Sequence, residues 1–304
     1  MKLLILGFSS ILQKKILRSF QKIDDICIEI ASKSSRSELV TYSDYYTALK
    51  ETKADLVYIS LVNSLHFYWA KKALDQKKHV IIDKPAVLNT LDANELISLA
   101  KKNNCLLAEA VVFNYHDIFE EFYKMQKKSN MFITAEFSFP QLPIDNFRYS
   151  KSLGGGAIYD LGPYAASIIR LFLDSKSLSL NSLILSRDIN GVDTSFTLQG
   201  KDDCNNFFSG YFGFCSEYVN NLKIISKNKN LSINKIFTLT SDETAKLFFQ
   251  QKNEKSSLEI KSDSFLNFLE SCILAIREGN FQSFYDSLLT NINIIEEIKC
   301  RSDL

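Results

Sequence analysis

The sequence predicts an α/β protein, in which a Rossmann domain with a doubly wound parallel sheet precedes an α+β domain with an open, mostly antiparallel sheet. In the first third of the chain, short apolar runs alternate with segments of helical spacing, which is the pattern of βαβ units. After about Val112, β-rich runs follow one another across short polar turns, which is typical of antiparallel hairpins. We place the domains at residues 1–112 and 113–304, with the last helix a candidate to pack back on the first domain.

The first domain contains five predicted strands, and helices separate most of them. Apolar, β-rich runs predict the strands at 3–6, 26–31, 56–61, 79–83 and 105–112. Helical spacing predicts helices at 11–20, 64–76 and 91–102.

The second domain contains more strands than helices. Helical patterns lie at 116–128, 160–173, 264–278 and 283–299. The β-rich runs lie at 132–139, 178–185, 194–199, 207–214, 222–225, 236–240 and 247–251. We expect about six of them to form the open sheet.

Composition narrows the functional class. The 304 residues are 46% hydrophobic and 23% charged, which fits a globular protein with a substantial core. The net charge of +1 leaves no basic excess for neutralising nucleic-acid phosphates. No apolar run approaches the ~20 residues of a membrane span, and the six cysteines form no metal-ligand pattern. We expect a cytoplasmic protein without a metal site.

A glycine directly after the first strand marks a candidate nucleotide site. Gly7 lies where a Rossmann domain turns tightly and directs a helix N-terminus at a pyrophosphate. The second and third glycines of the usual fingerprint are replaced by Ser9 and Leu12. The loop alone is therefore compatible with a dinucleotide site or with a plain βα turn.

The end of the second strand bears on cofactor choice. NAD enzymes usually place a carboxylate there for the ribose hydroxyls, whereas a 2′-phosphate requires cations. Here Ser32, Lys33 and Arg36 follow the strand, and Glu29 lies too early within it. If a dinucleotide binds, this composition favours NADP(H) over NAD(H). The alternative is a basic, solvated loop.

The segment LGGGAIYDLGPY at 153–164 places an acid and a phenol four residues apart. On a helix, residues at this spacing are neighbours, so Asp160 and Tyr164 would share one face. They form a candidate catalytic pair. The alternative is a glycine loop leading into a helix that buries Tyr164.

A lysine before a proline at the end of the fourth strand decides between these alternatives. Lys84, at the carboxyl end of a parallel strand, is expected to point into the ligand crevice. Asp83-Lys84-Pro85 resembles the Glu-Lys-Pro motif of the glucose-fructose oxidoreductase, inositol dehydrogenase and rhizopine catabolism (Gfo/Idh/MocA) family. Further segments resemble the family in the same order: 54–59, 63–66, 109–110, 147–148, 153–164 and 286–298.

This resemblance implies a nicotinamide-dependent oxidoreductase of sugars, sugar nucleotides, inositols or related compounds. The usual catalytic histidine of the family falls at Tyr164, so the chain resembles the tyrosine-bearing branch that includes dimeric dihydrodiol dehydrogenase. The resemblance places Asn63 and His66 beside the nicotinamide ribose and Glu109 near the ring. It also implies a homodimer or homotetramer formed through the sheet of the second domain.

The expected mechanism assigns a role to each candidate residue that would contact the substrate. Reduction of a ketone leaves an alkoxide, and the Tyr164 phenol is the candidate proton donor. A phenol has a pKa of about 10, which a nearby Lys84 ammonium would lower. Asp160 would orient a substrate hydroxyl or Lys84. Arg148 is either a holder of a substrate phosphate or carboxylate or a solvated loop arginine.

The predicted site therefore has three sets of residues. The catalytic residues are Lys84, Asp160 and Tyr164, and Arg148 joins them in binding substrate. The cofactor residues are Gly7, Ser9, Ser32, Lys33, Arg36, Asn63, His66, Asp83, Lys84 and Glu109. A second hypothesis is a sensor or scaffold that kept the dinucleotide fold and lost turnover. The retention of Lys84, Asp160 and Tyr164 favours the enzyme.

Overall fold

The computed structural model describes residues 1–33, 37–125, 129–252 and 254–302, and the chain divides into two compact units. The first unit consists of Met1–Val112 with Phe265–Leu289, and the second of Phe113–Ser264 with Thr290–Leu304. Each unit has its own sheet, parallel in the first and mostly antiparallel in the second. The predicted fold class is confirmed.

The sheet of the first unit is parallel throughout, in the order β2-β1-β3-β4-β5. Its strands are β1 (Lys2–Leu6), β2 (Cys27–Ala31), β3 (Leu56–Ile59), β4 (His79–Asp83) and β5 (Leu107–Ala110). Every residue of β3 is buried, as expected when helices cover both faces. The strand order changes direction between β1 and β3. In sheets of this kind, ligands bind at the carboxyl ends of the strands beside such a switch point.

The helices of the first unit differ in two places from the expectation. The predicted helix over 11–20 begins as a π-helical turn, η1, and continues as a short α-helix, α1. An unpredicted helix, α2, is capped by the Asp44 carboxylate, which accepts from the Thr47 backbone N–H at 2.9 Å. The elements are η1 (Leu12–Ile16), α1 (Leu17–Phe20), α2 (Tyr45–Glu51), η2 (Asn63–Leu65), α3 (His66–Asp75), α4 (Thr90–Asn103) and α7 (Ser264–Glu278).

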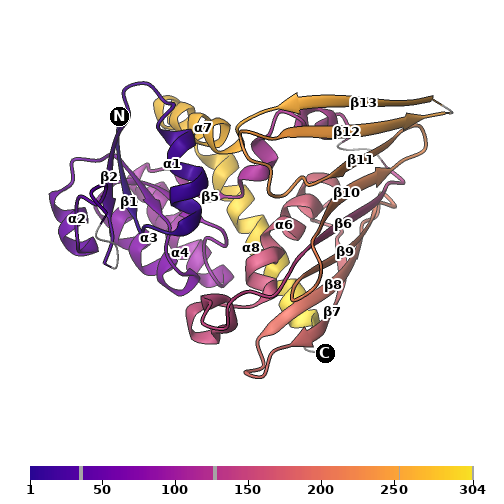
Figure 1. Cartoon of the computed structure of the whole chain (residues 1–304), viewed down its shortest axis with the longest axis horizontal. Helices are drawn as coiled ribbons and strands as arrows, with labels where there is room; N and C mark the ends of the chain where they lie inside the picture. Colours follow the sequence, from indigo (N-terminus) through magenta and orange to yellow (C-terminus); the bar gives the residue numbers. More distant parts are fainter. Residues whose placement is uncertain (34–36, 126–128, 253, 303–304) are drawn as a thin grey trace. The chain divides into compact units, whose positions relative to one another are not determined.

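The sheet of the second unit is open and has the order β13-β12-β11-β10-β6-β9-β8-β7 (Figure 1). All neighbouring strands are antiparallel except β6 and β9. Helix α6 (Ala157–Phe172) packs on this sheet over β8 and β9. The strands are β6 (Phe132–Phe139), β7 (Ser179–Arg187), β8 (Asp193–Lys201), β9 (Phe207–Phe214), β10 (Val219–Ile225), β11 (Asn230–Asn234), β12 (Thr244–Gln251) and β13 (Glu254–Lys261).

This sheet differs from the predicted one in number and in one element. It has eight strands, because the polar runs at β11 and β13 also pair. The run at 236–240, predicted as a strand, is a loop. Lys235 precedes it with φ 59°, a left-handed conformation that turns the chain out of the strand direction. The sequence of this run therefore predicts a strand, but the run pairs with no strand in the structure.

The remaining helices are short, except for the last. They are η3 (Val112–Tyr115), α5 (Phe119–Tyr123), η4 (Phe147–Tyr149), η5 (Lys151–Leu153) and α8 (Gln282–Ser302). The two units share α8, since its residues to Leu289 belong to the first and those from Thr290 to the second. Among the described residues, no helix combines the length and apolar character needed to cross a membrane.

Candidate active site

The turn after β1 requires glycine at position 7. Gly7 has φ 107°, and a Cβ there would lie 2.0 Å from the backbone oxygen of Ser60. Its N–H donates to the carbonyl of Ala31 at 2.9 Å. The ends of β1, β2 and β3 therefore meet closely at Gly7, where the strand order changes direction. Only a residue without a side chain fits this approach.

Ser9 replaces the second fingerprint glycine without projecting its hydroxyl freely into the turn. Its Oγ accepts from the Leu12 N–H at 3.1 Å and lies 3.0 Å from the Ser60 Oγ. The side chain thus caps the following helix and ties it to β3. Leu12 is fully buried and opens the π-helical turn η1. Such wider turns are frequent at functional sites.

A lysine at the end of β2 is held in place by a tyrosine. The Lys33 Nζ lies 5.2 Å from the centroid of the Tyr45 ring, within cation–π range. The Lys33 backbone also hydrogen-bonds the Tyr45 hydroxyl, which partly offsets the rise in the pKa of Tyr45 caused by burial. The preceding Ser32 is buried and donates its N–H to the Tyr42 backbone carbonyl at 2.9 Å. Arg36, the other predicted phosphate ligand, lies outside the described residues.

The acidic residue of β2 is already engaged. Glu29 accepts from Lys2 Nζ at 3.0 Å and from Thr52 Oγ1 at 2.5 Å. Burial alone would raise the pKa of Glu29, but these hydrogen bonds and the Lys2 charge lower it below the usual value. The Glu29 carboxylate is therefore engaged with Lys2 and Thr52, within the strand and before its carboxyl end. The Ser32–Lys33 end of the strand fits an anionic group such as a 2′-phosphate.

The segment after β4 contains the predicted Asp83-Lys84-Pro85 motif. The Asp83 carboxylate accepts a short hydrogen bond from the hydroxyl of Tyr58, a fully buried residue of β3. The Lys84–Pro85 peptide bond is cis. Lys84 is half-buried at the carboxyl end of the strand. The predicted position of Lys84 at the end of β4 matches the structure.

His66 and Glu109 fix the backbone around this motif. The His66 ring is fully buried, with Nδ1 2.8 Å from the Pro85 carbonyl and Nε2 3.0 Å from the Leu61 carbonyl. Glu109 accepts from the Ala86 N–H at 3.0 Å. Burial lowers the pKa of His66 despite these bonds. The structure thus brings His66 and Glu109 together with Lys84, but as backbone supports.

The three glycines before α6 bring distant parts of the second unit together. Gly154 and Gly156 have φ values of 76° and 116°. A Cβ on Gly155 would lie 2.4 Å from the Arg148 carbonyl oxygen, and one on Gly156 would lie 2.3 Å from Asp193 Oδ1. The Gly156 N–H donates to the Arg148 carbonyl at 2.9 Å. These glycines allow the chain to fold back on Arg148, which sequence spacing did not predict.

Arg148 and Asp160 form a largely buried ion pair. Arg148 Nε lies 2.7 Å from Asp160 Oδ2, and the two side chains are 18% and 7% exposed. Burial would lower the pKa of Arg148, but the Asp160 charge and hydrogen bond raise it, with a smaller contribution from Tyr164. Arg148 is therefore no solvated loop arginine. It neutralises the acid that stands one turn before Tyr164.

Tyr164 lies on α6 among phenylalanine rings. Pro163 is accommodated within the helix, so Asp160 and Tyr164 keep their one-turn spacing. The Tyr164 side chain is partly exposed. Its ring centroid lies 5.6, 5.1 and 5.4 Å from those of Phe113, Phe137 and Phe237. The aromatic contacts orient the ring, and the electrostatic interaction of the phenol with the guanidinium helps to raise the pKa of Arg148.

Asp193 is a supporting residue that sequence reasoning missed. Its Oδ2 accepts from the Ile158 N–H at 2.7 Å, in the first turn of α6, and burial raises its pKa. A carboxylate at this place is stabilised by the partial positive charge at the N-terminus of the helix. No motif marks Asp193 in the sequence. Elsewhere in the described part of the chain, His, Cys, Asp and Glu side chains form no group of three that could hold a metal ion.

Fold and local geometry together define a class of protein: one with a Rossmann unit of the dinucleotide-binding type. A glycine turn at the strand-order switch is a feature of that class. Residues 2–111 match the model of the NAD-binding Rossmann fold of the Gfo/Idh/MocA oxidoreductase family. This match lies within the first of the two units.

Two curated relatives are named for a sugar nucleotide and a sugar as substrates. A dTDP-3,4-didehydro-2,6-dideoxy-alpha-D-glucose 3-reductase of Saccharopolyspora spinosa is 26% identical over 234 residues, covering 76% of this chain and 70% of the relative. The D-xylose 1-dehydrogenase (NADP(+)) 2 of Haloferax volcanii is 30% identical over 204 residues and is matched over 62% of each chain.

Solved structures share the whole fold. KijD10, a 3-ketoreductase from Actinomadura kijaniata in complex with NADP and TDP-benzene, has a TM-score of 0.91 at 20% identity. The match covers 99% of this chain and 98% of that one. At this identity, the likeness establishes the fold alone.

Proposed function

We propose that this protein is an NADP(H)-dependent oxidoreductase that transfers a hydride between the nicotinamide and a carbonyl or hydroxyl carbon of a sugar or sugar nucleotide. The observation that carries the proposal is the arrangement on α6. There a partly exposed phenol, Tyr164, stands one turn after an acid whose charge is neutralised by buried Arg148. This arrangement suits proton transfer to a developing alkoxide.

Each residue has a role in this proposal. The bound cofactor supplies the hydride. Tyr164 delivers the proton to the substrate oxygen, and Lys84 provides a cation and hydrogen-bond donor for that oxygen. Arg148 and Asp160 hold each other, which fixes the polar side of α6. Nη1 of Arg148 also donates to Asn146 Oδ1 at 3.5 Å, so Nη2 is the guanidinium nitrogen that we propose for an anionic substrate group. The reverse reaction uses the same groups, with Tyr164 accepting the proton.

The cofactor assignment rests on the end of β2. Lys33 supplies a fixed cation there, and Glu29 is engaged with Lys2 and Thr52. The NADP in the KijD10 structures and in the name of the xylose dehydrogenase supports the same choice. The remaining proposed cofactor residues are Gly7, Ser9, Ser32, Arg36, Asn63, His66, Asp83, Lys84 and Glu109. Among them, His66 and Glu109 act by shaping the backbone around Lys84.

A sugar nucleotide is the favoured substrate. Several curated relatives are dTDP-hexose 3-reductases, and KijD10 was crystallised with TDP-benzene. The proposal further includes a cytoplasmic homodimer or homotetramer formed through the eight-stranded sheet. Exposed apolar side chains on its strands support that part, among them Leu183, Leu185 and Phe248.

The competing hypothesis of an inactive dinucleotide sensor is motivated by Ser9 and Leu12 in the glycine loop and by Val62 before Asn63. Ser9 caps the helix that follows, so its replacement of glycine has a structural reason compatible with cofactor binding. The enzyme hypothesis is therefore the stronger one.

Titration with NADPH and with NADH, followed by nicotinamide fluorescence, tests the proposal. NADPH should bind more tightly than NADH, and NADPH should be consumed in the presence of a dTDP-linked keto sugar. A screen of dTDP and UDP sugars, free pentoses and inositols then identifies the substrate. Failure to bind either nucleotide would refute the enzyme hypothesis.

A further inference from the structure

The loop between β11 and β12, residues 235–243, is held by side chains instead of by strand pairing. Asn220, on β10, does most of this. Its backbone carbonyl accepts from the Lys235 N–H, and its side-chain Oδ1 accepts from the Phe237 N–H at 3.0 Å. One residue of β10 thus supplies two acceptors to the loop, one from its backbone and one from its side chain. The loop leaves the sheet while the N–H groups of Lys235 and Phe237 keep acceptors on β10.

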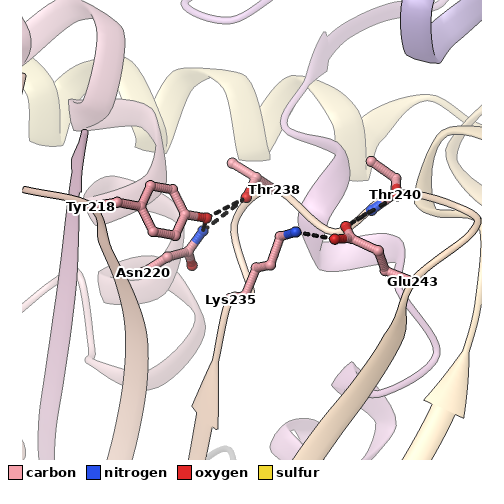
Figure 2. Close-up of polar contacts among 6 residues, drawn as sticks. All are labelled: Tyr218, Asn220, Lys235, Thr238, Thr240 and Glu243. Carbon is pink, nitrogen blue, oxygen red and sulfur yellow. Dashed lines mark hydrogen bonds and ion pairs between the residues drawn. The ribbon is translucent and has the colours of Figure 1, made fainter. Parts of the chain in front are cut away.

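Figure 2 shows that the other half of the Asn220 amide is equally engaged. Its Nδ2 donates to the Tyr218 hydroxyl and to Thr238 Oγ1, each at 3.0 Å, and these two oxygens are themselves 3.0 Å apart. Asn220 is only 3% exposed. A buried amide with such bonds is costly to disrupt, because its partners would be left unsatisfied.

The far end of the loop is closed by Glu243. Its Oε2 accepts from the N–H and the hydroxyl of Thr240, each at 3.0 Å, and its Oε1 pairs with Lys235 (Figure 2). These bonds and the Lys235 ammonium lower the pKa of Glu243, although burial alone would raise it. Both ends of the loop are therefore fixed, with Phe237 between them.

Phe237 connects this network to Tyr164. The Phe237 ring is 4% exposed and lies 5.4 Å from the Tyr164 ring, 5.2 Å from Phe113 and 5.5 Å from Phe137. Phe113 and Phe137 belong to η3 and β6, so their places are set by regular structure. Phe237 alone of the three depends on the loop.

We propose that Asn220 is a positioning residue for Tyr164. By holding the backbone of Phe237, it presses that ring against the phenol and keeps the hydroxyl in one orientation for proton transfer. This inference rests on the proposed function, in which Tyr164 is the proton donor. It assigns to a residue of β10 a kinetic role that neither its position nor its residue type signals.

The test compares Asn220→Leu with Asn221→Leu. Leucine has nearly the shape of asparagine without its hydrogen bonds. Asn221 is the next residue of the same strand, and its amide bonds Glu136 at 3.4 Å, away from the loop. Asn220→Leu should lower kcat about 10-fold or more, since small displacements of a catalytic group have effects of this size. The KM for NADPH should not change. Phe237→Leu, which keeps the loop backbone bonds, should lower kcat in the same way.

A double-variant cycle separates positioning from general weakening. In the Tyr164→Phe background, Asn220→Leu should cause no further loss of kcat, because the group it positions is already absent. An equal loss in both backgrounds would overturn the proposal, as would an unchanged kcat in Asn220→Leu.

A spectroscopic readout keeps this test independent of turnover. In protein labelled with fluorotyrosine, the Tyr164 resonance is assigned from its loss in Tyr164→Phe. It should shift or broaden in Asn220→Leu and remain unchanged in Asn221→Leu. If the wild-type protein reduced no sugar, the proposed function would fail. The fluorotyrosine resonance would still show whether Asn220 positions Tyr164. A Tyr164 resonance unchanged in Asn220→Leu would refute it.

Discussion

Arg148 Nε donates to the Asp160 carboxylate at 2.7 Å, and this contact links the short helix η4 to the buried face of α6. Removing one partner of such a pair leaves an uncompensated buried charge. Arg148→Met should therefore lower the free energy of unfolding by about 3–5 kcal/mol, as found for broken buried pairs. Urea denaturation followed by circular dichroism measures this.

The control is the double variant Arg148→Met with Asp160→Leu, which removes both charges. It should be more stable than Arg148→Met alone, because no isolated carboxylate remains. If both variants lost the same free energy, packing of the arginine side chain, and not the ion pair, would explain the effect.

Tyr164→Phe tests the proton donor directly. The substitution keeps the ring and its contacts with three phenylalanines and removes only the hydroxyl. If the phenol is the general acid, kcat should fall by about 100-fold or more. NADPH affinity should remain close to that of the wild type. Tyr159→Phe is a suitable control, since Tyr159 lies on the same helix and its hydroxyl accepts from Lys299 at 2.8 Å. Full activity in Tyr164→Phe would exclude Tyr164 from the mechanism.

Cofactor preference should depend on Lys33 and on the ring that supports it. Lys33→Met should weaken NADPH binding about 10-fold or more and spare NADH, because only NADPH carries the extra phosphate. Tyr45→Leu should have a smaller effect in the same direction, since it removes the ring beneath Lys33 Nζ. Fluorescence titration of both nucleotides gives the ratio of affinities. An equal loss for NADPH and NADH would place Lys33 outside a 2′-phosphate site.

Some site features followed from local sequence rules. Gly7 directly after a strand, Lys84 before a proline and the one-turn spacing of Asp160 and Tyr164 each depend on residues close together in the chain. Periodicity likewise predicted helix 264–278 at its observed bounds. These features were predictable because short-range geometry determines them.

Other features depend on contacts between distant segments, which no local pattern reports. Asp193 reaches the first turn of α6 from β8, and Asn220 reaches Phe237 from β10. The run at 236–240 shows the converse, because its alternation predicts a strand while side-chain hydrogen bonds draw it into a loop. Residues that support a site from another element therefore escape single-sequence reasoning.

Gly7→Ala should be severely destabilising. The alanine Cβ would lie 2.0 Å from a backbone oxygen, at a φ of 107° that side chains rarely adopt. We expect a loss well above the about 1–2 kcal/mol that a left-handed residue costs on its own. Gly279→Ala is the matched control, because Gly279 has φ 65° and no atom within 4 Å of the added Cβ. Thermal unfolding of both should show a much larger loss for Gly7→Ala. Similar losses would mean that β1 and β3 separate readily at this turn.

Stability should fall as the pH drops below about 6.5, before most carboxyl groups titrate. Burial lowers the pKa of all three histidines, His66, His79 and His116, below the usual value of about 6.5. A histidine kept neutral in the folded state binds its proton only in the unfolded state. Its contribution is therefore present above 6.5 and is lost as the pH falls toward the folded pKa.

Each such histidine contributes a slope of at most about 1.4 kcal/mol per pH unit in this window. His79→Asn isolates one of them, because the Asn oxygen can replace Nδ1 as acceptor for the Leu106 N–H, which is donated at 2.9 Å. Urea unfolding between pH 5 and 7.5, the range in which an unperturbed histidine titrates, should show a shallower loss for His79→Asn than for the wild type. Identical slopes would mean that His79 titrates equally in the folded and unfolded chain.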